Sequence, residues 1–274
     1  QSVYDTDAFQ SLIAAIENSY GKKYGVDQDT DYAIRVVSEH LRGATHLISD
    51  GVIPGNEGRN YVLRRIIRRA IFYSTRHLSN DIQLPRIAEV VIETMASSHP
   101  ELQHNKAHIQ KVLEEEERNF SRTLNSGKQI ISSKFGVLGL SATIEKESSS
   151  NNLTASSCEK LIQAFSSKVL PDNIKTAFVE PINTALNAQT AKSKSAKLSK
   201  SQASKLTKTI PGKCIFLLWD TYGLPPEVTG DIANDCGLQV DMKGFEEHLE
   251  RNRTASQQFD QENQSKVNNE DWIT

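Results

Sequence analysis

The sequence is poor in the residues that build disulfide frameworks, metal knuckles and membrane spans. Its three cysteines are far apart and form no Cys-x-x-Cys pair. Their number and spacing argue against a disulfide scaffold and favour a reducing compartment. The chain also lacks a run of about eighteen apolar residues, so neither a transmembrane helix nor a membrane partner is expected.

A strong net charge and a phosphate-binding loop are absent as well. Lysine and arginine total 32, aspartate and glutamate 34, and the net charge is −2, so any nucleic-acid surface must be a local patch. No Gly-x-x-x-x-Gly-Lys-Ser/Thr motif occurs, which excludes a P-loop nucleotide site. The chain starts at Gln1 without a signal-peptide pattern, and we expect it to begin inside a longer protein.

What the sequence does contain, up to about residue 140, is apolar residues at steps of three and four, which predict helices. These helices are expected within 1–25 and over about 30–49, 60–77, 84–97 and 101–134. Thr30 or Asp31 could cap the second of them. The four consecutive glutamates at 114–117 are typical of a solvated turn of helix.

The composition changes between Ser141 and Pro211. Six lysines and no acid lie between Thr190 and Thr209, so we predict no stable structure over 188–210. This lysine-rich stretch would be a passive linker or a flexible arm that touches RNA.

Order is expected again at Cys214–Trp219, an apolar run that is a strand or a helix, since periodicity does not decide between them. One helix should follow from Pro226 to a cap at Gly237, and another from Asp241 to about Gln258. The predicted fold is therefore mostly α, with a helical domain over 1–140, a low-complexity insertion or linker over 141–212, and a smaller α+β-like unit over 213–274.

Two stretches resemble the alanyl-tRNA synthetases, which are class II enzymes. The first runs from Asp31 to Ala70 and includes Asp50-Gly-Val-Ile-Pro-Gly-Asn-Glu-Gly-Arg-Asn-Tyr-Val-Leu-Arg-Arg-Ile-Ile-Arg-Arg-Ala70. The second is Leu218-Trp-Asp-Thr-Tyr-Gly-Leu-Pro225, followed by Gly237-Leu-Gln-Val-Asp-Met-Lys-Gly-Phe-Glu246. The opening Tyr4-Asp-Thr-Asp-Ala-Phe9 is also similar to the family, whereas the stretch from about 140 to 211 does not match. Gly55 and Leu224 stand where the family usually has serine and phenylalanine.

The resemblance implies that the helical part reads the acceptor stem of tRNA-Ala, whose identity signal is a G·U wobble pair. By motif, Asn56 and Asp220 would flank this pair from opposite grooves. An amide can both donate and accept in the minor groove, and a carboxylate can accept from an exocyclic amine in the major groove. Without the resemblance, Asn56 would be a helix N-cap and Asp220 an ordinary turn residue.

Arginines follow Asn56 closely. Arg59 belongs to the same motif, and the predicted helix over 60–77 carries a basic face at four-residue spacing, made of Arg64, Arg65, Arg68 and Arg69. Such a face suits the phosphate backbone of RNA. Alternatively, some of these arginines pair with the glutamates at 114–117, and we expect a mixture of the two.

His104 and His108 have an HxxxH spacing that could bind zinc. The editing domain of the family uses such a pair with a later cysteine and histidine, but no cysteine follows at the right spacing here. We therefore predict exposed helix residues, with no metal ligands and no catalytic residues in this chain.

For the whole enzyme, the resemblance implies ATP and magnesium in an upstream catalytic domain and zinc in a downstream editing domain, both on the same polypeptide. It also implies a cytoplasmic location, or an organellar matrix if the full chain carries a transit peptide. The main alternative is a free-standing RNA-binding or interaction protein derived from a synthetase. A helical DNA-binding protein is a third reading, which would need base-reading side chains on an exposed recognition helix.

Overall fold

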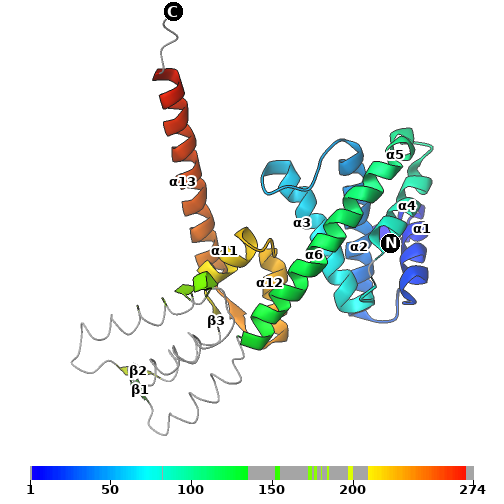
Figure 1. The fold of residues 1–274 in the computed structure, drawn as a ribbon. Helices are drawn as coiled ribbons and strands as arrows, with labels where there is room; N and C mark the ends of the chain where they lie inside the picture. Colours follow the sequence, from blue (N-terminus) through cyan, green and yellow to red (C-terminus); the bar gives the residue numbers. More distant parts are fainter. Residues whose placement is uncertain are drawn as a thin grey trace, which may run out of the picture. The chain divides into compact units, whose positions relative to one another are not determined.

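The computed structural model describes residues 2–81, 83–134, 152–154, 172–174, 176–177, 180, 184, 197–199 and 209–269. The chain divides into two compact units, an N-terminal unit of residues 1–125 and a C-terminal unit of residues 126–274. Helices dominate both units (Figure 1), so the predicted mostly α fold is confirmed. The domain limits at 140 and 212 stay predictions.

The N-terminal unit is a bundle in which α2 packs against α1, α3 and α4. The apolar stripe of α2, which includes Ile34, Val37, Leu41 and Ile48, is buried almost completely, as the periodicity predicts. The elements that begin in this unit are η1 Val3–Asp5, α1 Asp7–Tyr20, α2 Gln28–Ser49, α3 Gly58–Tyr73, a π-helical turn η2 Ser74–Leu78, α4 Leu84–Met95, α5 Pro100–His104 and α6 Lys106–Lys134.

The start of α2 differs from the sequence prediction. Asp27 is the N-cap, and its carboxylate accepts from the backbone N–H groups of Asp29 at 3.2 Å and Thr30 at 2.9 Å. The prediction of Thr30 or Asp31 as the cap is wrong because Asp27 already supplies an acceptor to the first free donors of the helix.

The predicted helix over 101–134 is also wrong as a single element. It is interrupted at Asn105, which separates α5 from α6. The side-chain amide of Asn105 donates to the carbonyl of Ser49 at 3.2 Å and to its hydroxyl at 3.1 Å. These two hydrogen bonds therefore hold the junction of α5 and α6 against the last turn of α2.

The C-terminal unit contains α11 Gly212–Asp220, α12 Pro226–Asp235 and α13 Met242–Asn269. The apolar run at Cys214–Trp219 is thus a helix, and α13 extends beyond the predicted end at Gln258. Two short strands, β3 Thr209–Ile210 and β4 Gln239–Val240, pair in parallel and bracket α11 and α12. Asp241 starts α13 as predicted, since its carboxylate accepts from the N–H of Gly244 at 2.9 Å.

The structure describes a second pair of strands. Strand β1, Asn152–Thr154, pairs antiparallel with β2, Lys197–Ser199. The prediction of no regular structure over 188–210 is therefore wrong at Lys197–Ser199 and at Thr209–Ile210. The rest of that segment lies outside the described residues. Of the helices described here, none is both long and apolar enough to cross a membrane.

Candidate nucleic-acid interface

Asn56 lies in the loop between α2 and α3, and its side chain is exposed. The N–H of Gly55 donates to the carbonyl of Asn60 at 3.0 Å, which folds this loop back onto the first turn of α3. The N-cap of α3 is Glu57, and no side chain caps the helix there. The interpretation of Asn56 as a helix cap is therefore wrong.

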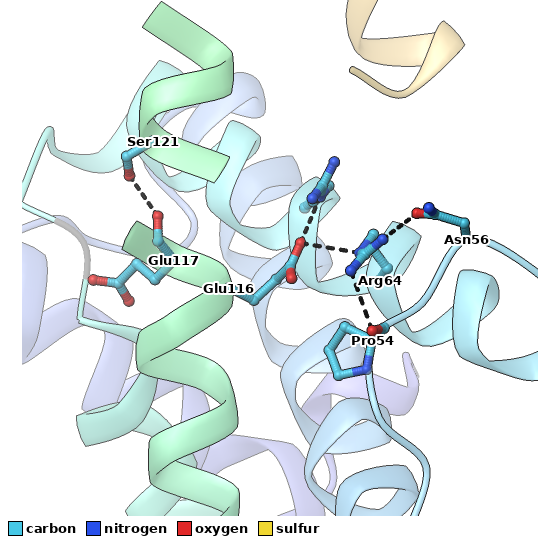
Figure 2. A network of polar contacts seen from close by, with 7 residues as sticks. Pro54, Asn56, Arg64, Glu116, Glu117 and Ser121 are labelled. Atoms are coloured by element: carbon cyan, nitrogen blue, oxygen red, sulfur yellow. Dashed lines mark hydrogen bonds and ion pairs between the residues drawn. The ribbon is translucent and has the colours of Figure 1, made fainter. Parts of the chain in front are cut away.

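Instead, the carbonyl oxygen of the Asn56 side chain accepts a hydrogen bond from Nη1 of Arg64. The same guanidinium donates through Nη2 to the backbone carbonyl of Pro54 at 3.2 Å. Figure 2 shows Arg64 between this loop and Glu116 of α6. One arginine thus holds two points of the loop that carries Asn56.

Glu116 is the buried centre of this network. One of its carboxylate oxygens lies 2.6 Å from Nε of Arg68 and 3.5 Å from Nε of Arg64. The side chain of Glu116 is only 5% exposed, so the expectation that all of 114–117 is solvated is wrong at this residue. Because both charges are buried, each needs a partner, and the Arg68 guanidinium also lies over the ring of Phe120, 5.1 Å from its centroid.

The four arginines of α3 therefore do not form one exposed face. Arg68 is 8% exposed, and burial lowers the pKa of its guanidinium, an effect that Glu116 opposes. Arg64 is mostly covered, whereas Arg65 is exposed. The predicted pairing with the glutamates at 114–117 is confirmed for Arg68 and Arg64, which both meet Glu116. The contact of the α3 arginines with an RNA backbone stays a prediction.

Arg69 rests on a histidine that sequence reasoning missed. Its Nε donates to Nε2 of His40 on α2 at 3.3 Å, and its guanidinium lies over the ring of Tyr73 at 5.5 Å. Because Nε2 of His40 accepts this hydrogen bond, it carries no proton, and the imidazole is neutral. Burial, and then the charge of Arg69, lower the pKa of His40 from 6.5 to about 4.

This depressed pKa predicts an acid-sensitive contribution to stability. The folded state favours neutral His40, so its contribution is complete above pH 6.5 and decreases as the pH falls toward 4. Between pH 7 and 4.5 we expect this group to remove on the order of 2–3 kcal/mol from the free energy of unfolding. Urea unfolding of the chain and of His40→Gln, which keeps an acceptor for Arg69, measures it. The difference between the two pH profiles isolates His40 from the carboxylates, and parallel profiles would contradict the prediction.

Asp220 and Arg59 lie at helix ends. Asp220 is the last residue of α11, and Arg59 is in the first turn of α3; both are exposed. Neither side chain makes a hydrogen bond or ion pair with any part of the chain that the structure describes. Asn56 and Asp220 belong to different units, so their juxtaposition across one base pair stays a prediction.

Comparison with known proteins identifies the family. The family model described as tRNA synthetases class II (A) matches residues 1–151 and 184–273. The chain belongs to this family. It is 34% identical over 258 residues to an alanine–tRNA ligase of an Anaeromyxobacter species, with 94% of this chain covered. An alanine–tRNA ligase of Desulfosudis oleivorans is 32% identical over 253 residues and covers 92% of the chain. The chain spans 23% and 22% of the lengths of these two relatives.

The match to the class II synthetase family covers more of the chain than the two motif stretches do. The family match resumes at residue 184, so the unmatched stretch is 152–183. This is shorter than the stretch from about 140 to 211 that fails to match on the sequence motifs alone. The lysine-rich residues that precede β3 therefore lie inside the region matched to the synthetases.

The HxxxH pair of this synthetase chain is divided between two helices. His104 ends α5, His108 lies in α6, and both are exposed. Among the residues that the structure describes, no three His, Cys, Asp or Glu side chains are grouped so that they could hold a metal ion.

Proposed function

We propose that this chain binds the acceptor stem of tRNA-Ala as one part of an alanine–tRNA ligase. Support comes from its membership in the class II synthetase family and from its similarity to alanine–tRNA ligases. In this proposal, ligation with ATP and magnesium takes place in an upstream catalytic domain, and zinc serves a downstream editing domain. The enzyme would act in the cytoplasm, or in an organellar matrix if the full chain carries a transit peptide.

The observation that carries the proposal is the pair of charges at the ends of α3 and α11. A cation in the first turn of a helix and an anion in the last turn each oppose the helix dipole, by about 0.3–1 kcal/mol. Arg59 and Asp220 occupy such positions, and neither side chain has a hydrogen bond or ion pair to a described residue. An external ligand would compensate both, since a phosphate suits Arg59 and a base amine suits Asp220.

Arg65 and Arg69 extend the cationic surface of α3 and are proposed to contact the RNA backbone. Arg68 is not among the proposed RNA contacts, because its guanidinium is buried against Glu116. Arg64 is proposed to act by holding the side chain of Asn56 rather than by binding a phosphate. The proposed division is thus between backbone contacts, which position the stem, and Asn56 and Asp220, which read the base pair.

Discrimination between a G·U and a G·C acceptor stem tests this division. Asn56→Ala and Asp220→Ala should each lower the ratio of the two affinities by about 5- to 100-fold, because each removes a base-edge contact. Affinities of the whole chain for the two stem-loop RNAs, measured by fluorescence anisotropy at two salt concentrations, give this ratio.

Arg65→Ala is the matched control, because it removes an exposed charge from the same surface. It should weaken binding to both stems alike and reduce the slope of log K against log salt by about one. If Asn56→Ala and Asp220→Ala also lower both affinities equally, these residues do not read the base pair and the proposed function is wrong.

A further inference from the structure

The contact between Asn56 and Arg64 decides which end of the Asn56 amide faces outward. Arginine has only donors, so the side-chain oxygen of Asn56 must be the atom that meets its guanidinium. The amide NH2 is then the end left for a ligand, because Asn56 is exposed. The usual ambiguity between the oxygen and nitrogen of an amide does not arise here.

Two hydrogen bonds and one longer ion pair hold Arg64 in place. Its Nη1 donates to Asn56 and its Nη2 to the carbonyl of Pro54 at 3.2 Å. Its Nε lies 3.5 Å from the carboxylate of Glu116, which is anchored in turn by Arg68 at 2.6 Å. A row of contacts therefore runs from the buried interior of α6 through α3 to an exposed amide, as Figure 2 shows for Glu116, Arg64 and Asn56.

These contacts reduce the conformational entropy that the Asn56 side chain loses when it binds a ligand. An exposed asparagine samples several rotamers, and fixing one of them reduces affinity. Here the backbone at Pro54 and the side chain at Asn56 are fixed by the same planar fork, so the orientation exists before the ligand arrives.

We infer that Arg64, seated on Glu116, is a positioning residue that orients the Asn56 amide so that it reads RNA as a hydrogen-bond donor. Its partner is a hydrogen-bond acceptor on a base edge that the G·U pair offers and the G·C pair does not. This inference rests on the proposed function, because it concerns the same base-reading site. It adds the polarity of the contact and the residues that set that polarity.

The test uses four single variants and one double variant of the whole chain, with the G·U and G·C stem-loop RNAs. Arg64→Met removes the fork but leaves Glu116 paired with Arg68, so the buried carboxylate keeps a partner. Asn56→Asp keeps an oxygen toward Arg64 and replaces the outward NH2 by a second acceptor. Asn56→Ala removes the amide, and Arg65→Met is the control for loss of one cation from α3.

We expect Arg64→Met, Asn56→Asp and Asn56→Ala each to lower the G·U to G·C affinity ratio by about 5- to 100-fold. Arg64→Met combined with Asn56→Ala should lower it no further than Asn56→Ala alone, because both act through one contact. Arg65→Met should leave the ratio unchanged. Since the ratio compares two RNAs on one protein, changes in overall charge cancel.

The variants separate failure of the positioning role of Arg64 from failure of the proposed function. If Asn56→Ala lowers the ratio but Arg64→Met does not, the positioning role is wrong and the proposed function stands. If Asn56→Asp keeps the ratio that Asn56→Ala loses, Asn56 acts as an acceptor and the donor assignment is wrong. If Asn56→Ala leaves the ratio unchanged, the proposed role of Asn56 fails, and this inference fails with it. Thermal unfolding shows whether Arg64→Met is folded; if it is not, the Asn56→Asp result decides the donor assignment.

Discussion

Replacing Glu116 by alanine is expected to lower the free energy of unfolding by about 3–5 kcal/mol. The variant leaves the guanidinium of Arg68 buried, 8% exposed, without the carboxylate that now lies 2.6 Å from its Nε. A buried charge without a partner is far more unfavourable than the loss of one ordinary hydrogen bond. Arg64 also loses the anion at 3.5 Å, so the effect should exceed that of a surface ion pair.

Chemical denaturation followed by far-UV circular dichroism measures this change. Glu115→Ala is the matched control, because Glu115 is the exposed neighbour on the same helix and should change stability by no more than about 0.5 kcal/mol. The double variant Arg68→Met with Glu116→Leu removes both buried charges and should recover much of the loss. A destabilisation by Glu116→Ala no larger than that of Glu115→Ala would mean that the pair is not closed in solution.

The second large effect is expected in the C-terminal unit, where Gly212→Ala should destabilise the fold by about 3 kcal/mol or more. A Cβ atom at residue 212 would lie 2.1 Å from the carbonyl carbon of Gly244 and 2.2 Å from the nitrogen of Phe245. Both obstacles are backbone atoms of α13, so no side-chain rotation relieves the overlap. The first turn of α11 would have to separate from the first turn of α13.

Gly230→Ala provides the comparison within the same unit. A Cβ atom there would meet Cγ2 of Val240 at 3.9 Å, an ordinary contact, and Gly230 lies inside α12. Alanine should therefore stabilise the helix by about 0.4–1 kcal/mol. Opposite signs for the two glycine variants in urea unfolding would support the close approach of α11 and α13, and equal small effects would contradict it.

The helices were predictable because their apolar residues repeat at the helical period and bury a continuous stripe. That signal locates α2 and α4 well, and proline at the first turn and a capping carboxylate mark the starts of α12 and α13. It does not reveal the break at Asn105, because the cause is a hydrogen bond to Ser49, which is distant in the sequence. Nor does it separate strand from helix in the short run at Cys214–Trp219.

The site was predictable only at the level of motifs. Asn56 and Asp220 emerge from a resemblance, and their exposure agrees with it, but the environment of Asn56 depends on tertiary contacts. Arg68 and Glu116 are 48 positions apart, and four consecutive glutamates give no sign of which one turns inward. His40 lies 29 positions from Arg69 and likewise carries no local signal of its role.

The parallel pair β3–β4 has a consequence for how this part of the synthetase tolerates change. Hydrogen bonds between Thr209–Ile210 and Gln239–Val240 close the intervening chain into a loop that contains Asp220. Residues 152–183, which the family model leaves unmatched, lie wholly upstream of that closure. The β1–β2 pair closes a separate loop around most of that segment. Because the entropy of closing a loop changes only slowly with its length, that loop can lengthen or shorten without altering the spacing around Asp220.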